Sequence, residues 1–250
     1  MSEQTGYVVD TATLPARTLP SSGAMMRVAI DRAVGCQNLE QRILRYGPSR
    51  ATTPAAPGSE DVLYAVAGQG HIIIGEDTYD LAPGTGALVP PGVAYTVDNN
   101  GPDDVLLVSV LSPQPERPAP PPGPRPVAPL GRLTVVEAGQ EALPAGDRRF
   151  KLLVDPRMGC HNVTQFVGFI PPGRAPFHTH TYEEVIYIVA GEGIAHVQDR
   201  DLPVRAGSSV YLPPLLEHCI ENTGDGPLRL LGVFCPAGDP SSKASESNRA

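Results

Sequence analysis

The two halves of this chain repeat one another, and this internal repeat limits the possible folds more than any other feature. Between residues 19–37 and 143–161, a Leu-Pro pair, an Asp and a Gly-Cys pair coincide at an offset of 124. Residues 60–70 (EDVLYAVAGQG) then align with residues 183–193 (EEVIYIVAGEG) at an offset of 123. Each copy is roughly 100 to 125 residues long, which is enough to bury a core of its own. We therefore expect two domains of the same fold.

A proline-rich segment separates the two copies. Half of the residues in 112–129 are proline, a composition typical of an extended polyproline II spacer. The expected organisation is therefore a first domain at 1–111, this linker at 112–129 and a second domain at 130–237. The remaining segment, 238–250, consists mostly of small and polar residues, and we expect it to be disordered.

Residues that form turns are frequent in this chain, with 26 Gly and 29 Pro among 250 residues. They separate short β-branched segments at intervals of about ten residues, which is the pattern of a β-sandwich or β-barrel. Few stretches show the 3.6-residue apolar period of a helix. We expect an all-β fold, with strands in the first copy at 27–30, 71–74, 86–91, 94–100 and 104–111. The expected strands of the second copy are 151–154, 162–170, 183–191, 193–198, 208–214 and 228–234.

Composition excludes several classes of function. The net charge is −8 and no basic run is present, so the chain lacks a surface that would follow nucleic-acid phosphates. No apolar run approaches the roughly 20 residues that span a bilayer, and the N-terminus has no apolar signal core. We expect a soluble cytoplasmic protein with no nucleic-acid or membrane partner. The four cysteines are too sparse for a disulfide scaffold and are expected to be reduced thiols.

Three histidines and one glutamate in the second copy form the strongest functional pattern. His178 and His180 lie two residues apart, so on an extended strand both imidazoles project from the same face. Glu184 has the same parity and can return to that face after a bend near Tyr182, while His218 follows 34 residues after Glu184. Imidazole nitrogens with one carboxylate suit Fe, Mn, Co, Ni, Cu or Zn better than Mg or Ca. We expect one divalent transition metal per chain at these four residues.

These residues stand in two motifs that resemble the signatures of the cupin family. The first signature is a Gly, His-x-His, three or four residues, Glu, six residues and Gly; the second is Pro-x-Gly-x-x-His-x-x-x-Asn. Two departures are visible: four residues instead of five separate Gly173 from His178, and Leu215 stands where the family usually has Gly. The resemblance implies that each half is a jelly-roll barrel with ligands pointing inward, so that the chain is a bicupin.

The first copy lacks this constellation. Asp61 occupies the position of Glu184, but the histidine positions fall at Ala55 and Pro57, and Tyr95 replaces His218. A single carboxylate without imidazole partners would bind a transition metal poorly. We expect the first barrel to be a metal-free copy with a structural or ligand-holding role.

Other residues are weaker candidates for the site. His196 could face the cavity, and Cys219 should point away from it. Strand parity gives four further residues that could line the pocket: Gln165, Phe169, Tyr182 and Tyr187. A phosphorylated substrate would need a basic cluster, for which only Arg174 and Arg205 are available. The N-terminal strands at 6–10 and 133–137 can each cross to the neighbouring barrel.

Four protein ligands leave one or two positions open for substrate on the metal. With a redox metal, an enolate or catecholate could react with dioxygen, whereas Mn or Zn would act as a Lewis acid. The leading hypothesis is a metal-dependent enzyme for a small oxygenated organic molecule, with dioxygenase chemistry slightly ahead of isomerase chemistry. The alternatives are an isomerase or decarboxylase that uses the metal as a Lewis acid, and a non-catalytic small-ligand-binding bicupin. Association through open strand edges would give a homodimer.

Overall fold

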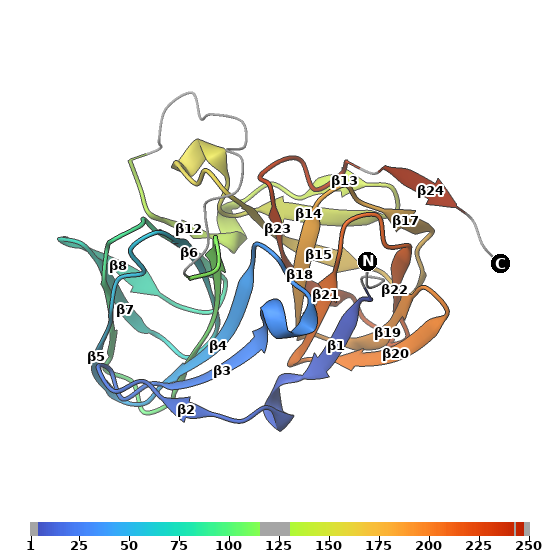
Figure 1. Ribbon diagram of the computed structural model, residues 1–250. Helices are drawn as coiled ribbons and strands as arrows, with labels where there is room; N and C mark the ends of the chain where they lie inside the picture. The colour runs from blue at the N-terminus through green and yellow to red at the C-terminus, as the bar shows by residue number, and fades with distance from the viewer. Residues whose placement is uncertain (1–4, 116–130, 243, 248–250) are drawn as a thin grey trace.

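Two β-barrels lie side by side in the computed structural model, one built mainly from each copy of the repeat (Figure 1). The structure describes residues 5–115, 131–242 and 244–247. Within these residues, 24 strands and four short 3-10 turns form the regular structure, so the expectation of an all-β fold is confirmed. Residues 116–129, which make up most of the expected linker, lie outside the described residues, and the polyproline II expectation concerns mainly these. None of the described helices is long and apolar enough to cross a membrane.

The first barrel consists of a seven-stranded and a four-stranded sheet. The larger sheet has the order β12-β9-β6-β11-β4-β3-β2 and the smaller one the order β5-β10-β7-β8. The strands of the larger sheet are β2 (Arg17–Thr18), β3 (Met25–Ile30), β4 (Glu40–Tyr46), β6 (Glu60–Ala67), β9 (Thr85–Val89), β11 (Val105–Ser112) and β12 (Thr134–Val136). Those of the smaller sheet are β5 (Ser49–Thr53), β7 (Gly70–Ile74), β8 (Asp77–Leu81) and β10 (Tyr95–Asn99).

The second barrel repeats this arrangement. Its seven-stranded sheet has the order β1-β21-β18-β23-β15-β14-β13, and its other sheet runs β20-β19-β22-β17-β24, with β16 (Gly173–Arg174) paired to β22. The larger sheet contains β1 (Tyr7–Asp10), β13 (Leu143–Ala145), β14 (Arg148–Leu152), β15 (Thr164–Ile170), β18 (Glu183–Ala190), β21 (Ser208–Leu212) and β23 (Leu228–Cys235). The other contains β17 (Phe177–Thr179), β19 (Glu192–Val197), β20 (Arg200–Arg205), β22 (His218–Asn222) and β24 (Ser245–Ser247). The 3-10 turns are η1 (Thr11–Thr13), η2 (Arg32–Val34), η3 (Glu137–Gly139) and η4 (Pro156–Met158).

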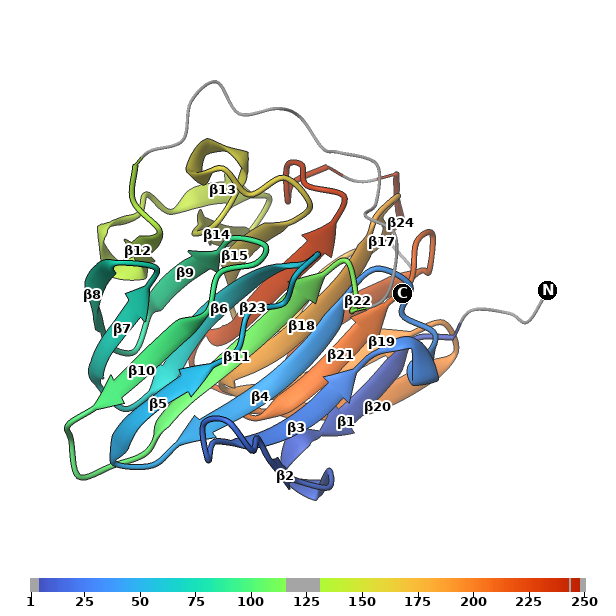
Figure 2. The ribbon, with the colours of Figure 1, turned by 60° about the vertical axis from the view of Figure 1, so that its left-hand side comes forward.

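Each copy donates one strand to the barrel of the other. Strand β1 pairs antiparallel with β21 of the second barrel, and β12 pairs antiparallel with β9 of the first. Figure 2 shows β1 at the edge of the second barrel, next to β20 and β21. The expected crossing of the N-terminal strands is therefore confirmed. Because each barrel contains a strand from the other copy, a cut at the linker does not separate the two barrels.

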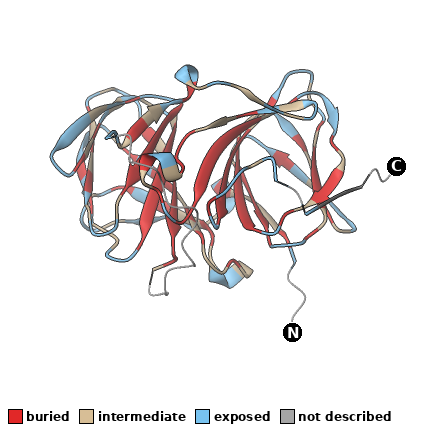
Figure 3. Ribbon diagram, turned by 90° about the horizontal axis from the view of Figure 1, so that it is seen from above, coloured by how far each residue is buried: buried red, intermediate tan, exposed pale blue. Residues whose placement is uncertain are grey.

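A hydrophobic core lies between the barrels and draws on both copies. Figure 3 shows buried strands of the two barrels facing one another. The core includes Val62 and Val110 from the first copy and Val185 and Val233 from the second. The four cysteines are buried free thiols, and Cys36 and Cys160 lie in this core, in agreement with a packing role.

Two buried glutamates tie the barrels together in a reciprocal manner. The Glu183 carboxylate accepts hydrogen bonds from the backbone N–H of Gln37 (2.6 Å) and Asn38 (2.7 Å) and from the Tyr211 hydroxyl (2.9 Å). Its repeat equivalent, Glu60, accepts from the backbone N–H of His161 (2.7 Å) and Asn162 (2.9 Å). Each carboxylate therefore satisfies backbone donors of the other copy, which would otherwise be buried without partners.

The C-terminal segment differs from the expectation of disorder for 238–250. Strand β24 pairs antiparallel with β17, and the backbone N–H of Ala244 donates to the carbonyl of Thr179 at 2.9 Å. The amide of Gly238 also bonds to the Thr164 hydroxyl at 3.0 Å. Composition indicated flexibility, but an unpaired edge at β17 offers the segment a partner for its backbone groups.

Candidate metal centre

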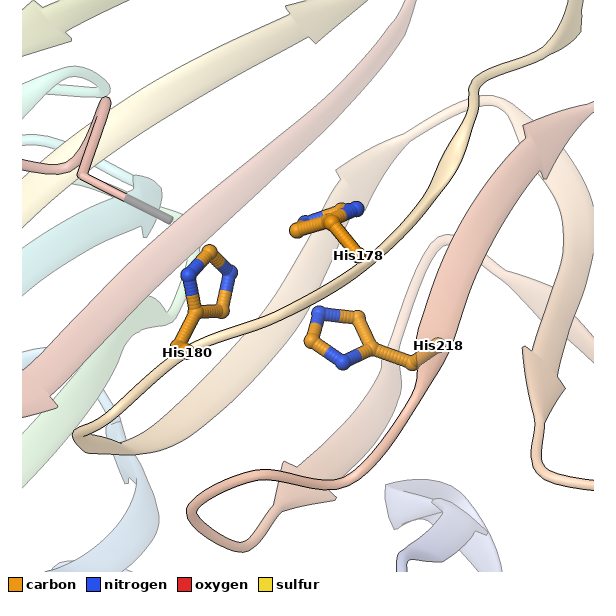
Figure 4. Close-up of side chains that lie close together, drawn as sticks. All are labelled: His178, His180 and His218. Carbon is orange, nitrogen blue, oxygen red and sulfur yellow. The ribbon is translucent and has the colours of Figure 1, made fainter. Parts of the chain in front are cut away.

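Three imidazoles meet inside the second barrel. His178 lies on β17, His180 follows one residue after the end of β17, and His218 begins β22, which pairs with β17 so that His178 and His218 are opposite one another. Ligand nitrogens of the three rings all lie within 4.8 Å of one another, and all three residues are buried. Figure 4 shows the rings turned toward one another. The sequence spacing therefore correctly brought these three histidines together.

One nitrogen of each ring is anchored by a backbone carbonyl. The Nδ1 atoms of His178, His180 and His218 lie 3.1, 3.2 and 2.8 Å from the carbonyl oxygens of Pro176, Ser242 and Leu216. A carbonyl can only accept, so each Nδ1 carries a proton, and in the neutral form of each ring the lone pair is on Nε2. Burial, with the neighbouring His178, lowers the pKa of His218 to about 3. The ring is thus neutral near pH 7, as a metal ligand must be.

Glu184 borders this triad from β18. One of its carboxylate oxygens lies 3.7 Å from Nε2 of His180, and the side chain is 5% exposed. Burial raises the pKa of Glu184 to about 8, because a carboxylate in apolar surroundings loses its hydration. A cation among the imidazoles would supply the missing charge. The cluster of mutually close ligand atoms consists of the three histidines, with Glu184 beside it. Imidazole nitrogens next to one carboxylate are a donor set that suits a divalent transition metal.

The cavity around the triad is small and mostly apolar. It measures about 90 Å³, and its walls include Phe150, Phe166, Tyr182, Ile186, Ile220 and Leu230. Pro240 and Ser241 of the C-terminal segment also line it. The Tyr182 ring stacks on His180, with centroids 4.4 Å apart. Such a cavity holds a small ligand, and little water besides.

Arg148 brings a positive charge into this apolar cavity. It begins β14 and lines the pocket, and its Nε atom is buried without a hydrogen-bond partner among the residues that the structure describes. Its nearest carboxylate is Asp147, at 3.8 Å from Nε. A buried guanidinium donor without a partner is costly, so this geometry favours an anionic ligand. Sequence reasoning missed Arg148, although the repeat aligns it with Ala24 of the first copy, which is buried.

The weaker candidates fall into two groups. Tyr182 and Phe169 line the pocket, whereas Gln165 and Tyr187 lie at the junction between the barrels. The Gln165 amide donates to the Leu63 carbonyl across the barrel junction, at 3.3 Å, and Tyr187 packs in the core between the barrels.

The other weak candidates of the second barrel lie outside the site. His196 does not line the cavity; its two nitrogens lie 2.6 Å from Asp201 and 2.8 Å from Glu221. Arg205 lies apart from the site and bonds to Asp10 at 2.5 Å. Arg174 is exposed, and its guanidinium lies over the Phe177 ring at 5.9 Å.

Hydroxyl groups fill the equivalent place in the first barrel. The Tyr95 hydroxyl lies 3.2 Å from that of Tyr46, which in turn lies 2.6 Å from the Thr53 hydroxyl. Asp61 accepts a hydrogen bond from Ser109 at 2.7 Å, and burial raises its pKa to about 6. Hard hydroxyl and carboxyl oxygens have replaced the imidazoles here.

Leu215 adopts a backbone conformation that glycine normally occupies. Its φ is 63°, and φ at Gly92, its equivalent in the first copy, is 77°. A non-glycine residue in this region carries a strain of roughly 1–2 kcal/mol, and the Leu215 side chain recovers little by packing because it is 66% exposed. The turn before His218 therefore keeps the geometry that the motif requires, at a cost in stability.

Replacing Leu215 by glycine is expected to stabilise the chain by about 0.5–1 kcal/mol, since relief of strain exceeds the added flexibility of the unfolded chain. Urea unfolding monitored by circular dichroism measures the change. The matched variant Gly92→Leu introduces the same strain in the first barrel and should lose about 1–2 kcal/mol. Equal stability of Leu215→Gly and the parent chain would contradict this account.

Comparison with known proteins is consistent with this architecture. A family model described as "Cupin domain" matches residues 43–111 and 166–234. The chain is 39% identical over 67 residues to an oxalate-binding protein of Thermotoga maritima, which is 26% of this chain and 55% of that protein. The chain thus spans about half the length of this relative.

Solved structures share the fold of the whole chain. Protein Ylba of Escherichia coli superposes with a TM-score of 0.77 at 14% identity, over 93% of this chain and 91% of the other. A mutant of Bacillus subtilis oxalate decarboxylase superposes with a TM-score of 0.71 at 15% identity, over 94% of this chain and 77% of the other. At these identities the likeness concerns the fold alone.

Proposed function

The chain belongs to the cupin family, and from its buried histidine triad we propose that the second barrel is a metal-dependent enzyme acting on a small organic carboxylate. One observation supports this most directly: three buried imidazoles, each anchored through Nδ1, line one cavity with the guanidinium of Arg148. Under this proposal His178, His180, Glu184 and His218 hold one divalent transition metal. When bound, such a metal supplies Lewis-acid activation of an oxygen that coordinates it.

The cavity favours a substrate that is both small and negatively charged. A volume of about 90 Å³ leaves no room for a multi-ring substrate such as a flavonol. The unpartnered Nε of Arg148 calls for an acceptor, and a carboxylate pairs with a guanidinium through two parallel hydrogen bonds. The matched relative that is named an oxalate-binding protein is in keeping with a ligand of this kind.

The residues of the chain have separable roles in this proposal. Arg148 orients the substrate carboxylate, and the apolar walls around Phe166 and Ile220 exclude water, which strengthens each electrostatic contact. The carbonyls of Pro176, Leu216 and Ser242 fix the rings of the triad in one orientation. Such outer contacts typically change metal affinity or activity 10- to 100-fold when removed.

Decarboxylation, or another reaction that needs only a Lewis acid, is the reaction class that we favour. The sequence alone placed dioxygenase chemistry slightly ahead. The comparisons give dioxygenase chemistry no advantage, because the named neighbours are an oxalate-binding protein and an oxalate decarboxylase. A non-catalytic binding protein stays as the alternative.

The experiment begins with protein purified without added metal and without a chelating tag. Elemental analysis should find about one transition metal per chain. Incubation with oxalate, and then with a panel of two- to four-carbon carboxylates, should release carbon dioxide without net oxygen uptake. Stoichiometric oxygen consumption would instead support a dioxygenase, and saturable binding without any product would support the binding protein.

Replacement of Arg148 by methionine should lower kcat/KM for the best carboxylate about 100-fold, because a charge-assisted bidentate contact of roughly 1.5–3 kcal/mol is lost in a buried site. Metal content and melting temperature should stay close to those of the parent chain. Arg50→Met is the matched control, since the Arg50 side chain is 67% exposed and lies on the first barrel. An unchanged kcat/KM in Arg148→Met would show that Arg148 does not bind a substrate carboxylate and would contradict that part of the proposal.

A further inference from the structure

A second cavity lies at the junction of the barrels, outside the metal pocket. This junction cleft measures about 650 Å³ and is lined by residues of both copies, among them Tyr64, Glu137, Arg149, Lys151, Phe169 and Arg229. Glu137 reaches it from the exchanged segment that follows β12. Arg149 and Phe169 line both the cleft and the metal pocket, so the two cavities are neighbours.

Three cations face this cleft against one carboxylate. The Lys151 ammonium donates to the backbone carbonyl of Glu137 at 3.0 Å, which leaves its charge uncompensated. The Arg149 side chain is exposed and makes no hydrogen bond or ion pair with any residue in the described part of the chain. Arg229 is paired with Glu137, but its Nε atom is buried and has no partner within those same residues. The cleft is therefore positive in a chain whose net charge is −8.

The cations sit in a fixed framework. The Arg229 Nη2 atom lies 2.9 and 2.8 Å from the two carboxylate oxygens of Glu137, and Glu137 also accepts a hydrogen bond from the Tyr64 hydroxyl at 2.6 Å. The guanidinium lies over the Phe169 ring, 5.8 Å from its centroid. This contact holds the group against an aromatic wall. The donors are thus positioned before any ligand arrives, which lowers the entropic cost of binding.

The internal repeat creates a second, equivalent junction between the barrels, and the positive cluster of Arg149 and Arg229 is absent there. The equivalent junction carries residues of different character at three positions, with Leu106 for Arg229, Met25 for Arg149 and Thr11 for Glu137. Its own cations, Arg27 and Arg45, have partners in the Leu14 carbonyl and in Asp104. Since the two junctions perform the same structural task, packing alone does not explain the charges around the cleft.

We propose that the junction cleft binds an organic anion, whose carboxylate or phosphate group lies against Arg149, Lys151 and Arg229. Its apolar part packs against the walls formed by Val66, Val136 and Phe169. The cleft is several times larger than the metal pocket, so its ligand is a larger molecule than the substrate of the barrel. The proposal rests on the junction alone and does not depend on a metal in the second barrel.

Calorimetric titration of the full chain at fixed low ionic strength tests this proposal. The probes are phenyl phosphate, benzoate and inorganic phosphate. One phenyl phosphate or benzoate should bind per chain at the cleft, and the tighter of the two identifies the anionic group. Binding should weaken at least 10-fold in Arg149→Met and in Lys151→Met, and inorganic phosphate should bind at least 10-fold more weakly than phenyl phosphate.

Two further variants serve as controls. Arg50→Met removes an exposed cation from a remote strand and should leave binding unchanged. Equal weakening in Arg50→Met would show that binding depends only on the net charge of the protein, and it would overturn the proposed site. His178→Ala disrupts the metal centre and should also leave this binding event unchanged. Loss in His178→Ala alone would place the ligand in the barrel and overturn the proposal, while leaving the proposed function intact.

Discussion

A chain with alanine in place of His180 is expected to lose its metal and keep its fold. The remaining ligands would be two imidazoles and one carboxylate, and removal of a direct ligand should weaken metal binding by more than the roughly 100-fold that outer contacts can reach. The metal-free barrel should remain folded because strand packing alone buries the part of its core formed by Ile188, Val197 and Leu228. Elemental analysis and circular dichroism give the two readouts.

The control for this prediction is His71→Ala. His71 is half exposed on the first barrel, and its imidazole lies 3.6 Å from the Asp80 carboxylate, far from the metal centre in sequence and in a different barrel, so metal content should not change. Retention of a full equivalent of metal in His180→Ala would contradict the ligand assignment. Loss of metal together with loss of fold would show a structural metal, which is the result expected of a non-catalytic bicupin.

Replacement of Glu183 by alanine is expected to destabilise the chain by about 3–5 kcal/mol. Two backbone N–H groups and the Tyr211 hydroxyl would lose their acceptor in a place where Glu183 is only 2% exposed. Each buried donor left without a partner costs about 1–3 kcal/mol, and these donors belong to both copies. Urea unfolding at pH 7 measures the loss, which is a large part of the stability of an ordinary domain.

The repeat provides a matched test of the same principle. Glu60→Ala removes the equivalent carboxylate and should cost a similar amount, because Glu60 also accepts from two backbone N–H groups of the other copy. Glu76→Ala removes an exposed carboxylate in a turn and should change stability by less than about 0.5 kcal/mol. If Glu183→Ala behaved like Glu76→Ala, the inter-barrel hydrogen bonds would contribute nothing measurable.

Sequence reasoning succeeded where the pattern was local. The strands around Val105–Ser112 and Glu183–Ala190 have continuous apolar runs bounded by Gly or Pro, and both form as expected. The spacing of His178, His180 and His218 correctly indicated that the three imidazoles share a face, because two-residue periodicity on an extended strand requires it for the first pair.

Sequence reasoning failed where the environment of a residue depends on contacts between distant parts of the chain. Strand β18 is buried on both faces, since one side forms the barrel wall and the other the core between barrels. Alternation of polar and apolar residues therefore disappears, and hydrophobicity does not reveal that Tyr187 faces away from the pocket. Arg148 was missed because its strand was expected to begin three residues later, which left the guanidinium in a loop.

The exchange of β1 and β12 gives the molecule the form of a domain-swapped homodimer whose two subunits have become one polypeptide. A single copy produced alone would carry an N-terminal arm with no sheet to join and a barrel edge with no arm to cover it. Two such copies satisfy one another. Within one chain the two halves can therefore differ at the site, with Tyr95 in the first barrel where the second has His218.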